Sequence, residues 1–169
     1  SNDGHIAHIS LVPRFNGEKT SSDDAFNAFV AGDLDCVSED FLSHQGEFIF
    51  VLDRSGSMDG DRIQMAKEAL IFFIKSLPPV SIFNVVSFGF SFKFLFPSSV
   101  NNTIEKVNEA LSAIQSFGAD MGGTEILNVL EKILKVNANI KYPRNVFLLT
   151  DGCVKNTKEV AQLIKHNNI

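Results

Sequence analysis

Runs of uninterrupted apolar residues alternate along the chain with segments whose apolar residues recur at helical spacing. The apolar runs predict strands buried on both faces, at residues 48–52, 81–88 and 145–150. The helical spacing predicts amphipathic helices at residues 61–75, 103–116, 125–135 and 157–166. A short alternating segment at residues 92–96 predicts an edge strand in a hairpin. This alternation predicts an α/β fold with a doubly wound, mostly parallel, Rossmann-like sheet covered by helices on both faces.

The N-terminal part of the chain has a different pattern. Residues 6–12 alternate loosely and end at Pro13, which predicts a short strand. Residues 16–45 are polar and rich in turn-forming residues, which indicates a linker or a packed loop. We therefore expect two parts: an irregular N-terminal extension over residues 1–45 and an α/β domain over residues 46–169.

Side chains that offer oxygen ligands follow the predicted strands at the points where the strands end. Asp53, Ser55 and Ser57 come directly after the first buried strand, and Asp151 follows the last one. Thr124 lies in the glycine-rich loop before the third predicted helix. Because the carboxyl ends of parallel strands meet at one edge of a sheet, we expect these five side chains to lie close together.

Two carboxylates and three hydroxyls form a ligand set suited to a hard divalent cation. Mg²⁺ prefers oxygen ligands in octahedral geometry and takes few protein carboxylates. The sequence therefore predicts a magnesium site, with manganese or calcium as alternative ions. Because hydroxyl ligands are neutral, the ion is expected to bind one more anionic oxygen, which an Asp or Glu of a partner protein would supply. Taken singly, each residue has a simpler interpretation, since Ser, Thr and Asp also cap helices and stabilise turns.

Three motifs together resemble the metal-ion-dependent adhesion site of von Willebrand factor type A domains. They are DRSGSM at residues 53–58, MGGT at residues 121–124 and LLTDG at residues 148–152. The resemblance covers residues 47–169 and fills every ligand position of the family pattern. It implies the metal ligands Asp53, Ser55, Ser57, Thr124 and Asp151.

The sequence of residues 46–58 is similar to one branch of this family. That branch includes inter-alpha-trypsin inhibitor heavy chains, the type A domain-containing protein 5 group and the vault poly(ADP-ribose) polymerase. In it a β-rich inter-alpha-trypsin (VIT) domain precedes the type A domain, so the resemblance implies that residues 6–15 are the closing strand and exit of such a domain.

The resemblance also implies a type A domain that is truncated at its C-terminus. A complete domain of the family would add about two more strand–helix units. The strand at residues 146–149 would then expose an apolar edge, a route to self-association. We expect residues 6–12, or the same region of a neighbouring molecule, to cover that edge.

Composition narrows the range of partners. The formal charge of −5, a pI near 5.3 and scattered Lys and Arg residues argue against nucleic acid. No apolar stretch reaches the length of a membrane span. Cys36 and Cys153 are far apart in the sequence, which favours free thiols and a cytoplasmic location, with secretion as the alternative.

The leading functional hypothesis is a non-enzymatic, magnesium-dependent protein-binding module. A metal-dependent hydrolase is one alternative, because divalent metals beside Asp also serve hydrolysis. The sequence contains no P-loop and no Gly-x-Ser-x-Gly motif, and its 4 histidines lie outside the ligand loops. A structural scaffold with an idle site is the other alternative. Arg54, which follows the first ligand, is expected to be a solvated loop residue.

Overall fold

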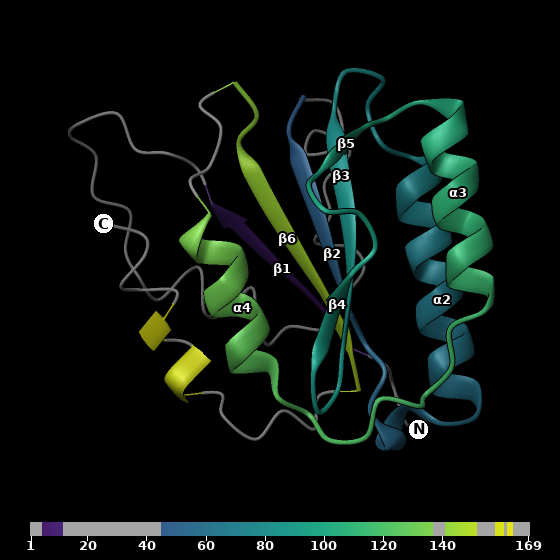
Figure 1. Ribbon diagram of the computed structural model, residues 1–169, viewed down its shortest axis with the longest axis vertical. Coiled ribbons are helices and arrows are strands. Elements are labelled where there is room, and N and C mark those ends of the chain that lie inside the picture. The colour runs from purple at the N-terminus through teal and green to yellow at the C-terminus, as the bar shows by residue number, and fades with distance from the viewer. Residues whose placement is uncertain (1–4, 12–44, 137–140, 152–157, 161, 164–169) are drawn as a thin grey trace.

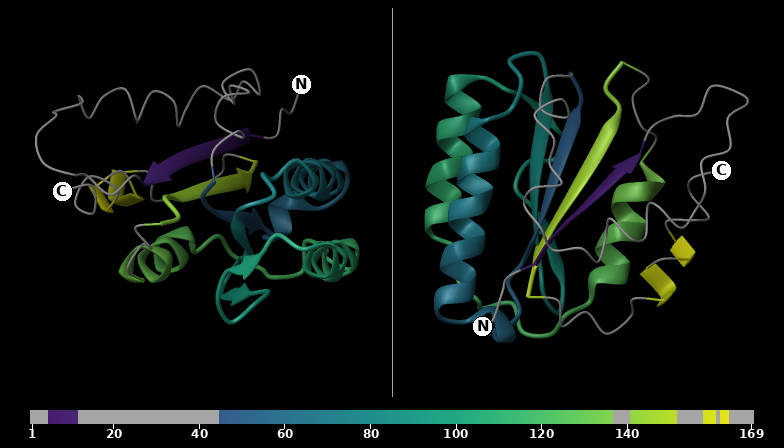
Figure 2. Two further views of the ribbon diagram at one scale, coloured as in Figure 1. Left: turned by 90° about the horizontal axis from the view of Figure 1, so that it is seen from above. Right: turned by 180° about the vertical axis from the view of Figure 1, so that it is seen from behind.

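A central sheet with helices on both faces forms the described part of the protein (Figures 1 and 2). The computed structural model describes residues 5–11, 45–136, 141–151, 158–160 and 162–163, with side chains for all but 5–11. The strands are β1 (His5–Leu11), β2 (Glu47–Asp53), β3 (Ile82–Phe88), β4 (Phe92–Phe94), β5 (Val100–Asn101) and β6 (Arg144–Thr150). The helices are the 3-10 helix η3 (Gly56–Met58), α2 (Asp61–Lys75), α3 (Ile104–Gln115) and α4 (Ile126–Lys135).

The sheet has a parallel centre and antiparallel edges. The strand order is β1-β6-β2-β3-β4, and β5 pairs with β3. Strand β2 runs parallel to both β3 and β6, whereas β1, β4 and β5 pair antiparallel to their neighbours. The carboxyl ends of β2, β3 and β6 therefore lie at one edge of the sheet, as the sequence pattern predicts.

Strand β1 covers the outer edge of β6. The two strands pair antiparallel along their whole length, from His5 opposite Thr150 to Leu11 opposite Arg144. This confirms that the N-terminal strand of the same chain covers the apolar edge predicted at residues 146–149. The cover therefore comes from within the molecule at this edge, because β1 occupies the hydrogen-bonding positions of β6.

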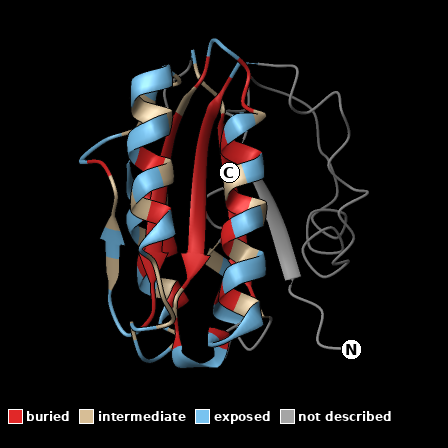
Figure 3. Cartoon of the chain, turned by 90° about the vertical axis from the view of Figure 1, so that its right-hand side faces the viewer, coloured by how far each residue is buried: buried red, intermediate tan, exposed pale blue. Residues whose placement is uncertain are grey.

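The two faces of the sheet pack against different kinds of side chain. On the face covered by α2 and α3, phenylalanine is the commonest buried residue: the ring of Phe147 lies 5.3 Å from that of Phe50 and 5.5 Å from that of Phe73, centroid to centroid. The other face is mainly aliphatic and packs against α4 and Val160. Figure 3 shows the buried residues concentrated on the strands between the helices. Burial on both faces explains why the central strands are apolar at nearly every position.

The predicted elements agree with the structure except at the shortest ones. Thr103 caps α3 as expected, because its side chain accepts a hydrogen bond from the backbone nitrogen of Lys106 at 3.3 Å. Strand β4 ends at Phe94 rather than at residue 96, and neither β5 nor η3 was predicted. Elements of two or three residues are too short to show a period in the sequence.

Some predictions fall wholly or partly outside the described residues. Within the helix predicted at residues 157–166, residues 158–160 and 162–163 are helical. The linker at residues 16–45 is described only at residue 45, and neither cysteine is described. Among the described helices, none has both the length and the apolar character that crossing a membrane requires.

Candidate metal centre

Asp53 is the last residue of β2, and its side chain is held between the ends of two parallel strands. Its Oδ1 accepts a hydrogen bond from the backbone nitrogen of Ser55 at 2.9 Å. Its Oδ2 accepts one from the hydroxyl of Thr150, the last residue of β6, at 2.7 Å. The residue is 0% exposed. The carboxylate is thus fixed at the sheet edge where the sequence predicts a ligand.

Ser55 and Ser57 lie in the turn that follows β2, and their hydroxyl oxygens are 3.0 Å apart. Ser55 occupies the N-cap position of η3, but its side chain makes no capping hydrogen bond. Ser55 is buried and Ser57 is exposed, so the pair extends from the interior to the surface. The helix-capping interpretation of Ser55 is therefore not supported, and the two hydroxyls face each other instead.

Backbone hydrogen bonds bring the glycine-rich loop that carries Thr124 against the loop after β2. The nitrogen of Met121 donates to the oxygen of Arg54 at 3.0 Å, and the nitrogen of Gly56 donates to the oxygen of Gly122 at 2.9 Å. Gly122 has a φ of 77°, a conformation that favours glycine. Two reciprocal bonds between the loops hold the residues just before Thr124 close to the Asp53–Ser57 turn.

Thr124 itself does not cap the helix that follows. The N-cap residue of α4 is Glu125, and that position has no side-chain capping bond. The structure shows no hydrogen bond from the Thr124 side chain to any other described residue. Its hydroxyl is therefore not committed to the capping role that the sequence left open.

Asp151 follows β6 and reaches the same edge. Its side chain is 4% exposed, and its Oδ2 lies 3.4 Å from Nη1 of Arg62, in the first turn of α2. The same Arg62 nitrogen donates to the backbone oxygen of Ser57 at 2.8 Å. Arg62 thus links the Asp151 carboxylate to the loop that carries Ser55 and Ser57. Asp53 at the end of β2, and the loops that carry the other four predicted ligands, thus lie at one edge of the sheet.

The chemistry of these five side chains fits a hard divalent cation. Two carboxylates and three hydroxyls offer oxygen atoms only, which suits Mg²⁺, Mn²⁺ or Ca²⁺ better than metals that prefer thiolate or imidazole. Within the described residues no group of three or more His, Cys, Asp or Glu side chains could hold a metal. A site in this part of the chain would therefore need other oxygen ligands as well, such as hydroxyls, carbonyls or water.

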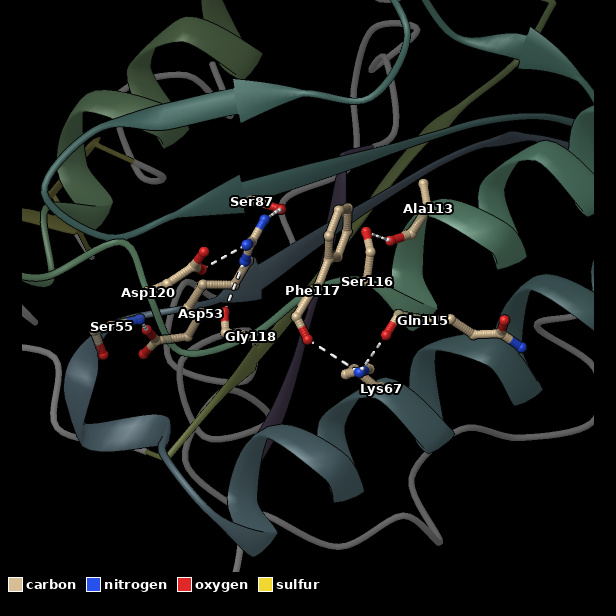
Figure 4. Close-up of polar contacts among 11 residues, drawn as sticks. Asp53, Ser55, Lys67, Ser87, Ala113, Gln115, Ser116, Phe117, Gly118 and Asp120 are labelled. Atoms are coloured by element: carbon tan, nitrogen blue, oxygen red, sulfur yellow. Dashed lines mark hydrogen bonds and ion pairs between the residues drawn. The ribbon is translucent and has the colours of Figure 1, made fainter.

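Arg54 is mostly shielded from solvent rather than fully solvated, so the expectation for this residue was wrong. Its side chain is 11% exposed. The Nε atom donates to the oxygen of Gly118 at 2.9 Å, Nη2 lies 2.5 Å from Oδ1 of Asp120, and the guanidinium carbon stands 4.4 Å from the centroid of the Phe117 ring. Figure 4 shows the dashed contacts that end on Gly118 and Asp120. Arg54 therefore fastens the start of the glycine-rich loop to the first ligand.

Lys67 supports the same loop from α2, and sequence reasoning did not single it out. Its Nζ donates to the oxygens of Gln115 and Phe117 at 2.9 and 3.0 Å, where α3 ends and the loop begins (Figure 4). A cation there satisfies carbonyl groups that a helix end leaves unpaired. The sequence did contain a signal, because Lys67 lies four residues after Ile63 and three before Leu70, on the buried stripe of the helix.

Comparisons with known proteins agree with this architecture. The family model described as von Willebrand factor type A domain matches residues 46–168. Human von Willebrand factor A domain-containing protein 5B1 is 40% identical over 135 residues, covering 80% of this chain, and the 5A protein of Rattus norvegicus is 41% identical over 132 residues, covering 73%. The chain spans only 11% and 16% of the lengths of these relatives.

A solved structure supports the same fold. The von Willebrand factor type A protein from Catenulispora acidiphila superposes with a TM-score of 0.50 and 24% identity, over 53% of this chain and 22% of that one. At this identity the likeness bears on the fold alone. With a family model matched over most of its length, the chain belongs to the von Willebrand factor type A domain family.

Proposed function

We propose that the chain is a magnesium-dependent protein-binding module. Von Willebrand factor type A domains generally mediate protein interactions. In this proposal Asp53, Ser55, Ser57, Thr124 and Asp151 hold the ion, and an Asp or Glu carboxylate of the partner completes its coordination. The observation that carries the proposal is the environment of the Asp53 carboxylate.

Asp53 is buried, and no described residue supplies a counter-charge for it. Both of its hydrogen-bond donors, the Ser55 amide and the Thr150 hydroxyl, are neutral. No Lys or Arg side chain among the described residues lies within ion-pair distance of it. Burying an uncompensated carboxylate is costly, and a bound cation offsets that cost. A carboxylate can accept about four hydrogen bonds or metal contacts, so these two bonds leave lone pairs for an ion.

A partner carboxylate follows from the neutral ligands. Two carboxylates balance the formal charge of a divalent ion, but three hydroxyls leave it electron-poor and ready for another anionic ligand. Ser57 is exposed, so the centre is accessible from the surface. Mg²⁺ is the proposed ion, and Mn²⁺ and Ca²⁺ are the alternatives to compare with it.

The proposed role is non-enzymatic. Hydrolysis at such a centre needs a general base or a nucleophile beside the metal. His5 and His8 lie in β1, whose side chains are not described, and the other two histidines lie outside the described residues. No observation on the described side chains favours a hydrolase over a binding module.

Calorimetric titration of the whole chain with Mg²⁺, and then with Mn²⁺ and Ca²⁺, tests the metal part of the proposal. Asp53→Ala should abolish the binding heat. Asp59→Ala is the matched control, because Asp59 is an exposed carboxylate in the same loop and should leave binding unchanged. Equal metal binding by wild type and Asp53→Ala would refute the proposed site.

Partner binding tests the rest of the proposal. Proteins captured on the immobilised chain should be released by a chelator and should not be retained by Asp53→Ala. Capture that is the same with and without the metal, and the same for Asp53→Ala, would favour the scaffold alternative. Turnover of a phosphoester or peptide library by the metal-loaded chain would instead favour a hydrolase.

A further inference from the structure

Phe90 is an exposed aromatic side chain next to the candidate metal centre. It lies in the turn after β3 and is 77% exposed. Single exposed apolar residues are common on protein surfaces and do not by themselves indicate a binding site. Phe90 differs from an ordinary exposed residue in how firmly its backbone is held and in which loop holds it.

Hydrogen bonds on both sides of the Gly89–Phe90 peptide tie this turn to the glycine-rich loop. The Phe90 nitrogen donates to the oxygen of Met121 at 2.7 Å, and the oxygen of Gly89 accepts from the nitrogen of Glu125 at 2.8 Å. These two bonds bracket the segment that contains Thr124. The turn that carries Phe90 is therefore fastened to the loop that carries a predicted ligand.

Gly89 shows how closely the turn and the loop approach each other. A Cβ atom at this position would lie 2.4 Å from the oxygen of Met121, a distance that real side chains do not adopt. Close backbone approach of this kind needs glycine. The approach fixes the direction in which the Phe90 backbone leaves the sheet edge, so a partner would meet a side chain whose backbone is already ordered.

The surface between Phe90 and Thr124 is formed by Gly122 and Gly123. A Cβ atom on Gly122 would lie 3.7 Å from the Cβ of Phe90, and one on Gly123 would lie 3.7 Å from its Cδ2. Phe90 is the only described residue, chain neighbours aside, that either added atom would meet within 4 Å. Both glycines are exposed. A low surface without side chains thus runs from the Phe90 ring toward Thr124.

We propose that Phe90 is a specificity-determining contact of the binding site, which selects protein segments with an apolar residue close in sequence to the metal-binding Asp or Glu. The apolar side chain packs on the Phe90 ring across Gly122 and Gly123 while the carboxylate reaches the ion. This inference rests on the proposed function. An aromatic residue that is ordered before binding contributes strongly to affinity, because little entropy is lost when its surface is buried.

The test is selection from a displayed library of short random peptides, each with one fixed Glu, on the whole chain in Mg²⁺. A second library has Gln at the fixed position. Selections are repeated on Phe90→Ser, on Phe72→Ser and on Asp53→Ala. Phe72 is the matched control, because it is 64% exposed and lies on α2, outside the Phe90 turn and the glycine-rich loop. Thermal unfolding midpoints equal to that of wild type establish that both Phe variants are folded.

Wild type and Phe72→Ser should enrich peptides with Leu, Ile, Val or Phe near the fixed Glu. Phe90→Ser should still require Glu and Mg²⁺ but lose that enrichment, and it should bind the best wild-type peptide about tenfold more weakly. Unchanged enrichment on Phe90→Ser would overturn the inference and leave the proposed function standing.

Other outcomes separate the two claims further. Peptides that bind equally well with Gln, with a chelator or on Asp53→Ala would overturn the proposed function, and this inference with it. Mg²⁺-dependent binding to phosphatidylserine vesicles that Phe90→Ser abolishes, without any peptide enrichment, would overturn the inference in favour of a membrane surface.

Discussion

Strand β2 has a buried carboxylate at each end, and the two carboxylates differ in whether a cationic side chain neutralises them. At the amino end, Oε2 of Glu47 lies 2.7 Å from Nε of Arg144, and Oε1 accepts a hydrogen bond from Ser99 at 2.6 Å. At the carboxyl end, Asp53 has only neutral donors among the described residues. Glu47 is 6% exposed and Asp53 is 0% exposed, so burial does not distinguish them.

Arg144, the partner of Glu47, makes further hydrogen bonds. Nη1 of Arg144 donates to the backbone oxygens of Ile133 and Val136 at 2.7 and 2.6 Å, which joins β6 to the end of α4. The charge of Glu47 at the amino end of β2 is therefore neutralised by Arg144. We call this the closed end of β2, and the end at Asp53 the open end. The two ends differ in that Glu47 has a cationic partner, whereas no described residue supplies one for Asp53, and this difference is what the proposed metal site at Asp53 would explain.

The largest expected effect comes from Arg144→Met, which removes the cationic partner of Glu47. This change leaves the Glu47 carboxylate buried without a cation, so the free energy of unfolding in urea should fall by about 3–5 kcal/mol. The control is the double variant that adds Glu47→Gln, which should recover much of the loss because no charge remains. Equal losses in the single and double variants would assign the cost to the Ile133 and Val136 hydrogen bonds instead.

Asp53→Asn removes the charge at the open end and should behave in the opposite way. In a chelator the free energy of unfolding should stay within about 1 kcal/mol of wild type or rise, because an uncompensated buried charge is lost. With Mg²⁺ at about 100 times its dissociation constant, wild type should gain about 2.7 kcal/mol and the variant nothing. Asp59→Asn, in the same loop, should respond to Mg²⁺ like wild type. A loss in chelator as large as that of Arg144→Met would make Asp53 a structural residue.

Gly89→Ala tests whether stability and Mg²⁺ binding at the Asp53 end of β2 depend on the close approach of the turn after β3 to the glycine-rich loop. The added Cβ would collide with the Met121 backbone, so we expect a loss of about 2 kcal/mol in unfolding free energy and weaker Mg²⁺ binding. Gly56→Ala is the control, because nothing lies within 4 Å of its added Cβ. Its stability should stay within about 0.5 kcal/mol of wild type. If the two alanine variants behave alike, the loop contact has no special role.

Arg62→Gln should have the smallest effect, a gain of about twofold to fivefold in Mg²⁺ affinity. Arg62 forms an ion pair with Asp151, so a metal ion bound by Asp151 would compete with Arg62 for the carboxylate. Because the pair is partly exposed, it contributes little free energy and the expected gain is small. Gln keeps a donor for the Ser57 oxygen. Lys93→Gln removes the same charge from an exposed residue of β4 and should leave Mg²⁺ affinity unchanged. An equal gain in both variants would reflect net charge alone.

Much of the fold could be predicted because strands that are buried on both faces of the sheet are apolar at nearly every position. The continuous apolar runs of β2, β3 and β6 identified the parallel centre, and the need to cover an apolar edge identified the place of β1. The five candidate ligands could be placed together because strand ends of parallel strands share an edge. No measurement on this chain tests the ion itself, so metal binding stays a prediction.

Features that depend on one tertiary contact could not be predicted in the same way. Arg54 is a charged residue in a loop, and nothing local to it reveals that Gly118, Asp120 and Phe117 surround its guanidinium. Thr150 resembles any polar residue at a strand end until β6 is placed beside β2, where its hydroxyl meets Asp53. Both residues owe their roles to neighbours that are far away in the sequence.

The pairing of β1 with β6 has a consequence for the order of folding. These are the first and last strands of the described chain, so their contacts have the greatest sequence separation in the sheet. Closing so long a loop costs entropy that only the finished sheet repays, and such pairings form slowly. During synthesis β1 leaves the ribosome long before β6 exists. It therefore has no pairing partner in this sheet until β6 has been synthesised.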